Sequence, residues 1–164
     1  MDIYQWIVYL HVLAGFTLFF SHGASASMAF RLRREHKVER IRALLDLSGY
    51  SIMAMFLSLL VLLVAGVVAG FVGKWWNRGW IWASLALSVA IVALMFKYAR
   101  QYYSPVRRAV GLPYWEGSRE HPAVDPASGE EIAAAIAATR PVILAIIGYG
   151  GLALILWLMR FKPF

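Results

Sequence analysis

The chain has 164 residues, of which 61% are hydrophobic, and its mean hydropathy is +0.64. Soluble domains are about 45–50% apolar, so this composition excludes an ordinary soluble protein. The sequence contains no cysteine, which excludes disulfides, thiolate metal sites, iron–sulfur clusters and thiol redox chemistry. The net charge of +7 resides beside the hydrophobic segments, where membrane topology explains it without nucleic acid.

Four long segments without fixed charge predict four transmembrane helices. They cover approximately residues 3–30, 47–72, 80–96 and 141–159. Roughly 20 helical residues cross a hydrocarbon core about 30 Å thick, whereas an open sheet would leave backbone polar groups unpaired in lipid. We therefore expect an all-α integral membrane four-helix bundle that forms a single domain over residues 1–164. The first span should remain in the mature protein, because Asp2 stands where a signal peptide carries basic residues.

The basic residues are distributed unequally between the two ends of these spans. The loops 31–46 and 97–140 hold six Lys or Arg each, and the opposite side holds four in total. Lys and Arg concentrate in cytoplasmic loops, so both termini are predicted to be non-cytoplasmic. Six of the seven tryptophans lie near the non-cytoplasmic ends of the spans, which agrees with this orientation. We expect a prokaryotic-type cytoplasmic membrane, with the lipid bilayer as the immediate partner.

The first span is the only one that carries histidines. His11 and His22 are eleven positions apart, which places them on one helix face about 16 Å apart along the axis. Ionisable residues within a span usually face the bundle interior or a cavity. They are candidate axial ligands of haem iron, since imidazole is a standard haem ligand. Alternatively, each is a neutral structural histidine bonded to a backbone carbonyl or to a serine: Ser21, Ser25, Ser48 or Ser51. A role in binding another metal or in proton transfer is the third possibility.

The second span offers one candidate for a second haem ligand. If the first turn is centred on residue 36, His22 is level with about Tyr50, and Met53 lies one turn away. Its thioether is a recognised axial ligand. His11 has no comparable partner, so it would bind haem in a five-coordinate state or across a dimer. Gly15, on the same helix face, would leave room for a porphyrin edge.

Asp46 is the other ionisable candidate near the inner interface. It lies about one turn from the level of His22, where a carboxylate would raise the basicity of the imidazole. The simpler expectation is an ion pair with Arg42 or a position capping a basic cluster. His36 and His121 are assigned to the loops, which offer no further ligands for zinc. We therefore expect no metal site beyond haem iron.

Three local patterns predict details of the other helices. Gly66 and Gly70 form a GxxxG pattern in the second span, which favours close helix packing. Ser128 and Glu131 form a capping box, which predicts a helix start within the second cytoplasmic loop. Pro141 either begins the fourth span or kinks one continuous helix.

Helical spacing also extends the second helix. Val38, Ile41 and Leu45 recur on one helical face, with charged residues between them. The second helix is therefore predicted to begin well outside the bilayer and then to enter it.

Residues 6–15, with the sequence WIVYLHVLAG, resemble the first helix of the CopD-like superfamily of small membrane proteins. The resemblance covers roughly 30 residues and the four-span layout. That superfamily includes copper-resistance membrane proteins, HemJ-type protoporphyrinogen oxidases and families of unknown function. In HemJ-type relatives the first-helix histidine is associated with haem b, which implies haem binding at His11. The sequence lacks the methionines and histidines of copper handling, so it looks closest to an uncharacterised branch.

Two functions are expected from these patterns. The first is a membrane protein that binds b-type haem through His11, with or without His22, in a redox-related role. The second is a non-enzymatic accessory subunit of a larger membrane complex or a homo-oligomer, in which both histidines are structural. The sequence leaves open whether the protein is an enzyme.

Overall fold

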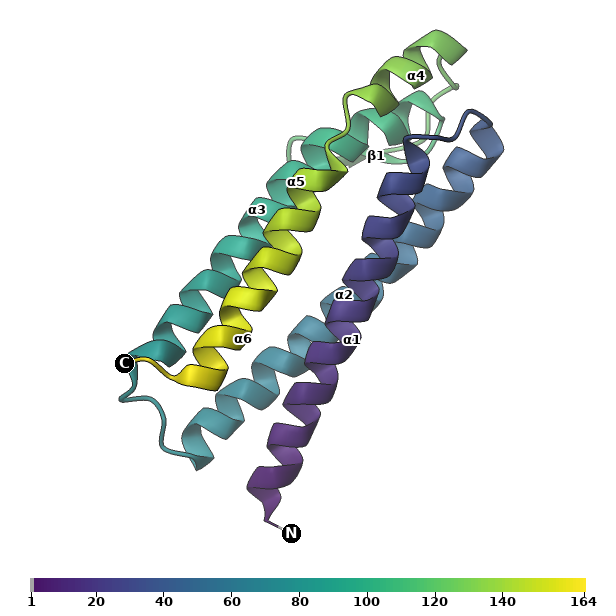
Figure 1. Cartoon of the computed structure of the whole chain (residues 1–164). Coiled ribbons are helices and arrows are strands. Elements are labelled where there is room, and N and C mark those ends of the chain that lie inside the picture. Colours follow the sequence, from purple (N-terminus) through teal and green to yellow (C-terminus); the bar gives the residue numbers. More distant parts are fainter. Residues whose placement is uncertain (1) are drawn as a thin grey trace.

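The computed structural model describes residues 2–164 and consists of four helical limbs with a small β-hairpin (Figure 1). The elements in chain order are α1 (Ile3–Leu32), α2 (Val38–Val72), α3 (Gly79–Ala109), β1 (Tyr114–Glu116), β2 (Arg119–His121), α4 (Gly129–Ala137), α5 (Pro141–Ala145), the π-helix η1 (Ile146–Gly150) and α6 (Gly151–Phe161). Each limb is long and apolar enough to cross a membrane. The predicted all-α, multi-pass four-helix membrane protein is confirmed.

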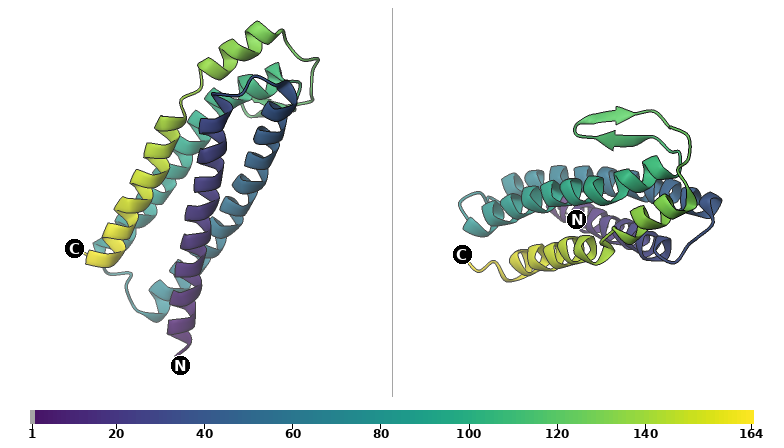
Figure 2. Two further views of the ribbon diagram at one scale, coloured as in Figure 1. Left: turned by 45° about the vertical axis from the view of Figure 1, so that its right-hand side comes forward. Right: turned by 90° about the horizontal axis from the view of Figure 1, so that it is seen from above.

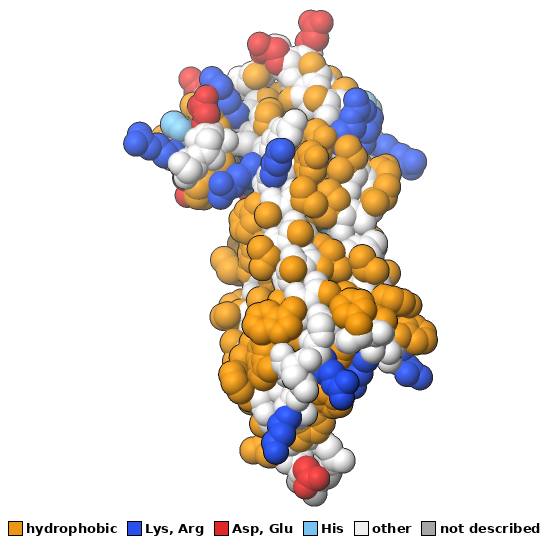
Figure 3. All heavy atoms as spheres, turned by 90° about the vertical axis from the view of Figure 1, so that its left-hand side faces the viewer, with side chains coloured by type: hydrophobic (Ala, Val, Ile, Leu, Met, Phe, Trp, Pro, Cys, Tyr) orange, Lys and Arg blue, Asp and Glu red, His pale blue; other side chains and the backbone are white. Residues whose placement is uncertain are grey.

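The limbs are arranged as two antiparallel pairs. The helix α1 packs along α2, and α6 packs along α3, so that the two pairs lie side by side (Figures 1 and 2). Both ends of the chain lie at one end of the bundle, and the β-hairpin and α4 lie at the other. Hydrophobic side chains cover the middle of the outer surface, while charged side chains gather toward its two ends (Figure 3). This distribution matches a chain whose central band contacts lipid.

Two helices extend far beyond the length that a bilayer requires. The helix α2 has 35 residues, or roughly 52 Å at 1.5 Å per residue. It begins at Val38, well before the predicted span that starts at residue 47, so the predicted helical extension of the second span is confirmed. The helix α3 continues through Pro105 to Ala109, past the predicted end of its span at residue 96. The region from 97 to 109 was expected to lie in a loop, and its helical state is the first correction.

A compact core beyond the membrane explains these extensions. It consists of apolar residues from four helices: Leu32, Ile41, Leu45, Val106, Val110, Ile132 and Ile136. Val106 and Val110 are completely buried, four residues apart on one face of the α3 end. Their burial stabilises helical structure where the sequence alone reads as polar and aromatic loop. We call this set the inner-end core.

The start of the fourth limb follows the predicted local patterns. The Ser128 hydroxyl accepts a hydrogen bond from the Glu131 backbone N–H at 3.3 Å, and the Glu131 carboxylate accepts one from the Ser128 backbone N–H at 2.9 Å. This reciprocal pair confirms the capping box. Pro141 occupies the first turn of α5 after a break at residues 139–140. It therefore begins the fourth span, which decides between the two alternatives for this proline.

The turn between α1 and α2 is stabilised by one acidic side chain. The Glu35 carboxylate accepts hydrogen bonds from the backbone N–H groups of Lys37 at 3.2 Å and His36 at 3.0 Å. These two donors favour the charged form and hold the pKa of Glu35 below its ordinary value. Arg40 lies 3.8 Å from the same carboxylate, an exposed surface pair. The turn therefore occurs where the sequence placed it, near residue 36.

The β-hairpin was not expected from the sequence. Its strands are three residues each, pair antiparallel, and turn at Gly117, whose φ is +59°. The Ser104 hydroxyl attaches the hairpin to α3 through hydrogen bonds with the Trp115 backbone, one of them from the Trp115 N–H at 2.7 Å. Strands this short carry little periodicity, so only the turn residue Gly117 indicated their presence.

Candidate functional site: a cleft between two helix pairs

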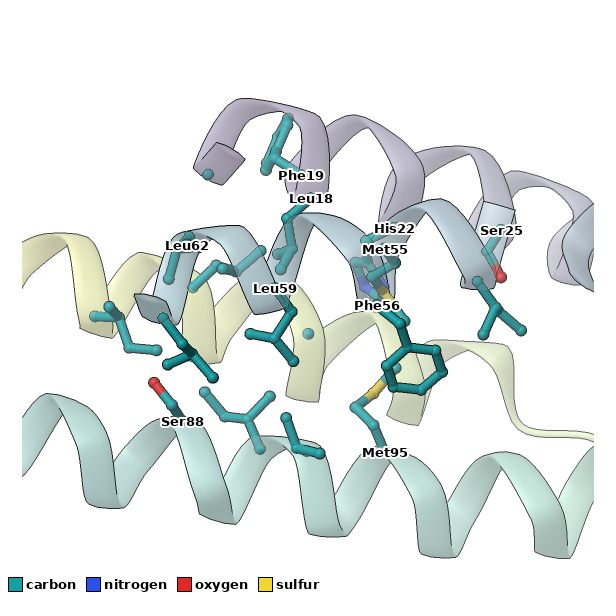
Figure 4. A pocket seen from close by; sticks show the side chains of 18 of the residues that line it. Leu18, Phe19, His22, Ser25, Met55, Phe56, Leu59, Leu62, Ser88 and Met95 are labelled. Atoms are coloured by element: carbon teal, nitrogen blue, oxygen red, sulfur yellow. The ribbon is translucent and has the colours of Figure 1, made fainter. Parts of the chain in front are cut away.

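A large apolar cavity separates the α1–α2 pair from the α3–α6 pair. Its volume is about 1070 Å³, and side chains from all four limbs line it (Figure 4). Sites for small molecules and cofactors are usually about 300–1,000 Å³, mostly apolar, with a few convergent polar groups. The polar groups in the membrane-level wall are few: His11, His22, Ser25, Ser48, Ser84 and Ser88. The cavity is therefore of cofactor size and chemistry.

His11 lines this cavity and has a fixed ring orientation. Its Nδ1 lies 2.8 Å from the backbone carbonyl oxygen of Leu62 on α2. A carbonyl only accepts hydrogen bonds, so Nδ1 carries the proton and the neutral ring keeps its lone pair on Nε2. Histidines that bind metals usually donate the other ring N–H to a carbonyl or a carboxylate. This arrangement prepares Nε2 for a metal ion.

Gly66 makes the approach of His11 possible. A Cβ atom at this position would lie 3.0 Å from Cε1 and 3.1 Å from Nδ1 of His11. The residue is four positions after Leu62, and in an α-helix a carbonyl points toward the residue four positions ahead. The absent side chain therefore exposes the Leu62 carbonyl to the imidazole. Gly66, the first glycine of the GxxxG pattern, therefore makes room for the His11 imidazole and does not serve helix–helix packing alone.

His22 has a different environment. It is 5% exposed, and its ring meets the Tyr149 ring edge-on at a centroid distance of 4.8 Å. Its Nε2 faces Gly148, where a Cβ atom would lie only 2.1 Å away. Within residues 2–164, the buried Nε2 has no hydrogen-bond partner. The ring is therefore enclosed between α1 and the fourth limb.

The π-helix η1 creates the recess that His22 occupies. Its wider turn runs from Ile146 to Gly150 in the middle of the span and presents Gly148 toward α1. Tyr149 reaches α1 from the same turn, because its hydroxyl lies 2.9 Å from the Cβ position of Gly23. Such π-segments occur frequently at functional sites. The sequence indicated close packing around Tyr149 through its glycines, but not the π-helix.

The histidine partners predicted from the sequence are only partly confirmed. His11 bonds a carbonyl across the helix interface, as the structural alternative expected. Three of the four serines expected near His22 are engaged elsewhere. Ser25 and Ser48 bond each other at 2.8 Å, and Ser51 donates to the Leu47 carbonyl of its own helix.

Met53 lies outside the cavity. Its side chain is 61% exposed on the outer surface, whereas Met55 and Met95 line the cleft. Met53 was predicted from its height relative to His22 along the bundle. Two residues along a helix rotate a side chain by about 200°, so the methionine that faces the cavity is Met55. Figure 4 shows Met95 projecting from α3 into the cavity. The available thioethers are therefore Met55 and Met95 rather than Met53.

Asp46 also differs from its expected arrangement. Its carboxylate lies 3.9 Å from the Arg107 guanidinium of α3, and its side chain is half-exposed. Arg42 instead donates from Nε to the Val110 carbonyl at 2.6 Å. The predicted Asp46–Arg42 pair is therefore wrong, because Arg42 ties α2 to the end of α3. Asp46 does not line the cavity.

The wall opposite His11 carries hydroxyls and no strong iron ligand. The rings of Phe56 and Phe96 stack with centroids 5.3 Å apart, which sets the register between α2 and α3. With this register, Leu62 and Gly66, the residues of α2 that His11 contacts, are level with about residues 86–90 of α3. Ser84 and Ser88 line that wall, each donating to a carbonyl of α3 at 2.8 Å. His11 therefore faces an open, weakly polar wall.

Gly15 was expected to leave room for a porphyrin edge, but it is in ordinary packing contact with α2. It lines the cavity one turn after His11, but its Cβ position lies 3.5 Å from the Leu62 side chain, an ordinary contact distance. Among residues 2–164 there is no group of three or more His, Asp or Glu residues arranged around a metal ion. The described part of the cleft therefore offers its metal-binding side chains singly rather than as a cluster.

Comparison with known proteins gave no match to any protein-family model, curated protein or solved structure. The function is therefore inferred from the cleft and its side chains alone.

Proposed function

We propose that the protein binds b-type haem in the cleft, with His11 as the axial ligand, and acts in a redox-related role in the membrane. The observation that carries this proposal is the His11 ring itself. Its Nδ1 is hydrogen-bonded to the Leu62 carbonyl, and the residue lines an apolar cavity of about 1070 Å³. When bound, haem supplies an iron centre for one-electron or oxygen chemistry.

The chain's own residues account for the remaining requirements of such a site. The apolar walls exclude water, and the Leu62 carbonyl fixes the orientation of the imidazole and its tautomer. The wall across from His11 presents Ser84 and Ser88 rather than a second strong ligand. A haem held by His11 would have the Ser84 and Ser88 hydroxyls on the opposite wall.

Two expectations from the sequence support the proposal. The resemblance of residues 6–15 to the CopD-like superfamily concerns this same histidine. The basic loops favour an orientation in the cytoplasmic membrane with both termini non-cytoplasmic. His11 then lies in the outer half of the bilayer, and electron exchange is easiest from the non-cytoplasmic side.

His22 fits a structural role within this proposal. Its Nε2 lies against Gly148, where a Cβ atom would be only 2.1 Å away, so the ring fills a recess between helices. Met55 and Met95 line the cavity as further thioether groups. We therefore assign the ligand role to His11 and the packing role to His22.

A non-enzymatic accessory subunit is the second candidate. One observation favours it: a purely structural histidine also makes the 2.8 Å bond from His11 to the Leu62 carbonyl. In that case the protein functions through association, in a larger complex or as a homo-oligomer. Stoichiometric partners retained in mild detergent, together with the absence of haem, would support this role.

A haem titration of the detergent-solubilised, haem-free protein separates the two functions. We expect a Soret band to develop with the wild type and His36→Ala, a loop control. Loss of a residue that only hydrogen-bonds a metal ligand typically weakens binding about 10–100-fold. We expect His11→Ala to weaken haem binding by more than this, because it removes the ligand itself. Unchanged binding by His11→Ala would contradict the assignment of the ligand.

A further inference from the structure

The second glycine of the GxxxG pattern seats another ring beside His11. The Trp76 indole packs against Gly70, whose Cβ position lies 3.1 Å from Cε2 and 3.3 Å from Nε1. Gly66 and Gly70 are four residues apart on one face of α2, or about 6 Å along its axis. The His11 imidazole and the Trp76 indole are therefore adjacent occupants of one groove, with Trp76 nearer the outer end.

The indole N–H of Trp76 is a buried donor without an acceptor. Both rings line the cavity, and the Trp76 Nε1 has no hydrogen-bond partner within residues 2–164. An unpaired buried donor is costly, and a buried indole N–H usually finds an acceptor. The cavity thus offers a metal-binding lone pair at His11 and, one turn outward, a donor that requires an acceptor.

Lys162 adds a positive charge at the same end of the cavity. It lines the cleft, and its Nζ lies 4.3 Å from the centre of the Trp75 ring and 5.5 Å from that of Trp80. These rings hold the ammonium group by cation–π attraction and leave its donors available. Among the described residues, no carboxylate lies within ion-pair distance of Lys162. The outer mouth therefore combines a neutral donor with an uncompensated cation.

We propose that the Trp76 indole N–H and the Lys162 ammonium bind the carboxylate side chains of the haem that His11 ligates. The proposal rests on the proposed function and adds a direction to it: the acid edge of the haem faces the tryptophan-rich outer end of the bundle. A carboxylate supplies what Trp76 lacks, an acceptor, and what Lys162 lacks, a counter-charge. The apolar part of the ring is then left to the walls between the two helix pairs.

The test compares ferric haem with haem dimethyl ester, whose acid groups carry no charge. Both are titrated into haem-free protein in detergent, and the dissociation constant is taken from the Soret band. Trp76→Phe keeps a ring on Gly70 and removes only the N–H group. Lys162→Gln removes the charge. The matched controls are Trp6→Phe and Lys74→Gln, which change a tryptophan and a lysine outside the cavity lining.

We expect Trp76→Phe and Lys162→Gln each to weaken the binding of haem by about tenfold, the range of a charge-assisted hydrogen bond. Binding of the dimethyl ester should be weaker in the wild type and less sensitive to both substitutions, because the ester oxygens still accept hydrogen bonds but carry no charge. The two controls should bind both forms as the wild type does.

Two results would overturn the inference, and they differ from each other. If a Soret band that depends on His11 forms, but the acid and the ester bind equally in every variant, the haem proposal stands and the carboxylate subsite falls. If neither form gives a Soret band, the haem proposal falls and the subsite with it.

Discussion

Gly148→Ala is expected to destabilise the bundle strongly, whereas Gly150→Ala in the same π-helix is expected to be neutral or slightly stabilising. The added methyl group at Gly148 would lie 2.1 Å from Nε2 of His22, a distance that forces helices apart or the ring out of its recess. Overpacking of this kind costs about 1–3 kcal/mol, and sometimes more. A Cβ at Gly150 meets no atom within 4 Å, and alanine is the better helix former.

The measurement is the unfolding of the detergent-solubilised protein, followed by circular dichroism against temperature or denaturing detergent. The double variant His22→Ala/Gly148→Ala removes the ring that the new methyl group meets. It should therefore lose much less stability than the sum of the two single variants. Additive losses would show that His22 and Gly148 are not in contact.

Gly66→Leu is the second substitution with a large expected effect. Even a Cβ atom at Gly66 lies 3.0 Å from His11, so a leucine displaces the imidazole and covers the Leu62 carbonyl. We expect haem affinity to fall at least about tenfold, the lower range for the loss of an outer-shell partner of a metal ligand. Unfolding should also occur at lower temperature, because α1 is separated from α2.

Gly150→Leu is the matched control for this substitution. Gly150 lies in the fourth limb outside the cavity lining, and a Cβ atom there has no neighbour within 4 Å. Haem titration of the two variants should show the loss only for Gly66→Leu. Equal haem affinity in both variants would mean that the seat of His11 on α2 does not matter for binding.

Local sequence patterns predicted the elements of the fold well. Charge-free segments gave the four spans, the capping box at Ser128 gave the start of α4, and Pro141 gave the start of α5. Each of these depends on neighbours within a few residues. The end of α3 was missed, because it depends on the burial of Val106 and of the C-cap residue Val110 in the inner-end core, which includes residues distant in sequence.

The candidate site was only partly predictable from local sequence patterns. His11 and His22 stand out because they are the histidines of a charge-free span, and both line the cavity. Their different roles depend on the facing glycines, Gly66 and Gly148, and so on the register between helices. The methionines show how far helical spacing can predict the site. It predicted the height of Met53 along the bundle, but Met53 faces outward and Met55 lines the cavity.

The pairing of charged residues at the inner end was beyond local patterns as well. Asp46 meets Arg107 because α2 and α3 run side by side, and Arg42 is drawn to the exposed carbonyl of Val110 at the end of α3. Neither pairing follows from helical spacing within one helix, which is the information that the sequence offers directly.

The most direct test of haem binding is the absorption spectrum of the wild-type protein purified in mild detergent from haem-replete cells. We predict a Soret band in stoichiometric amount relative to the chain, with the spectrum of a five-coordinate or weakly six-coordinate haem. A colourless protein, folded by circular dichroism and free of haem by extraction, would contradict the proposal.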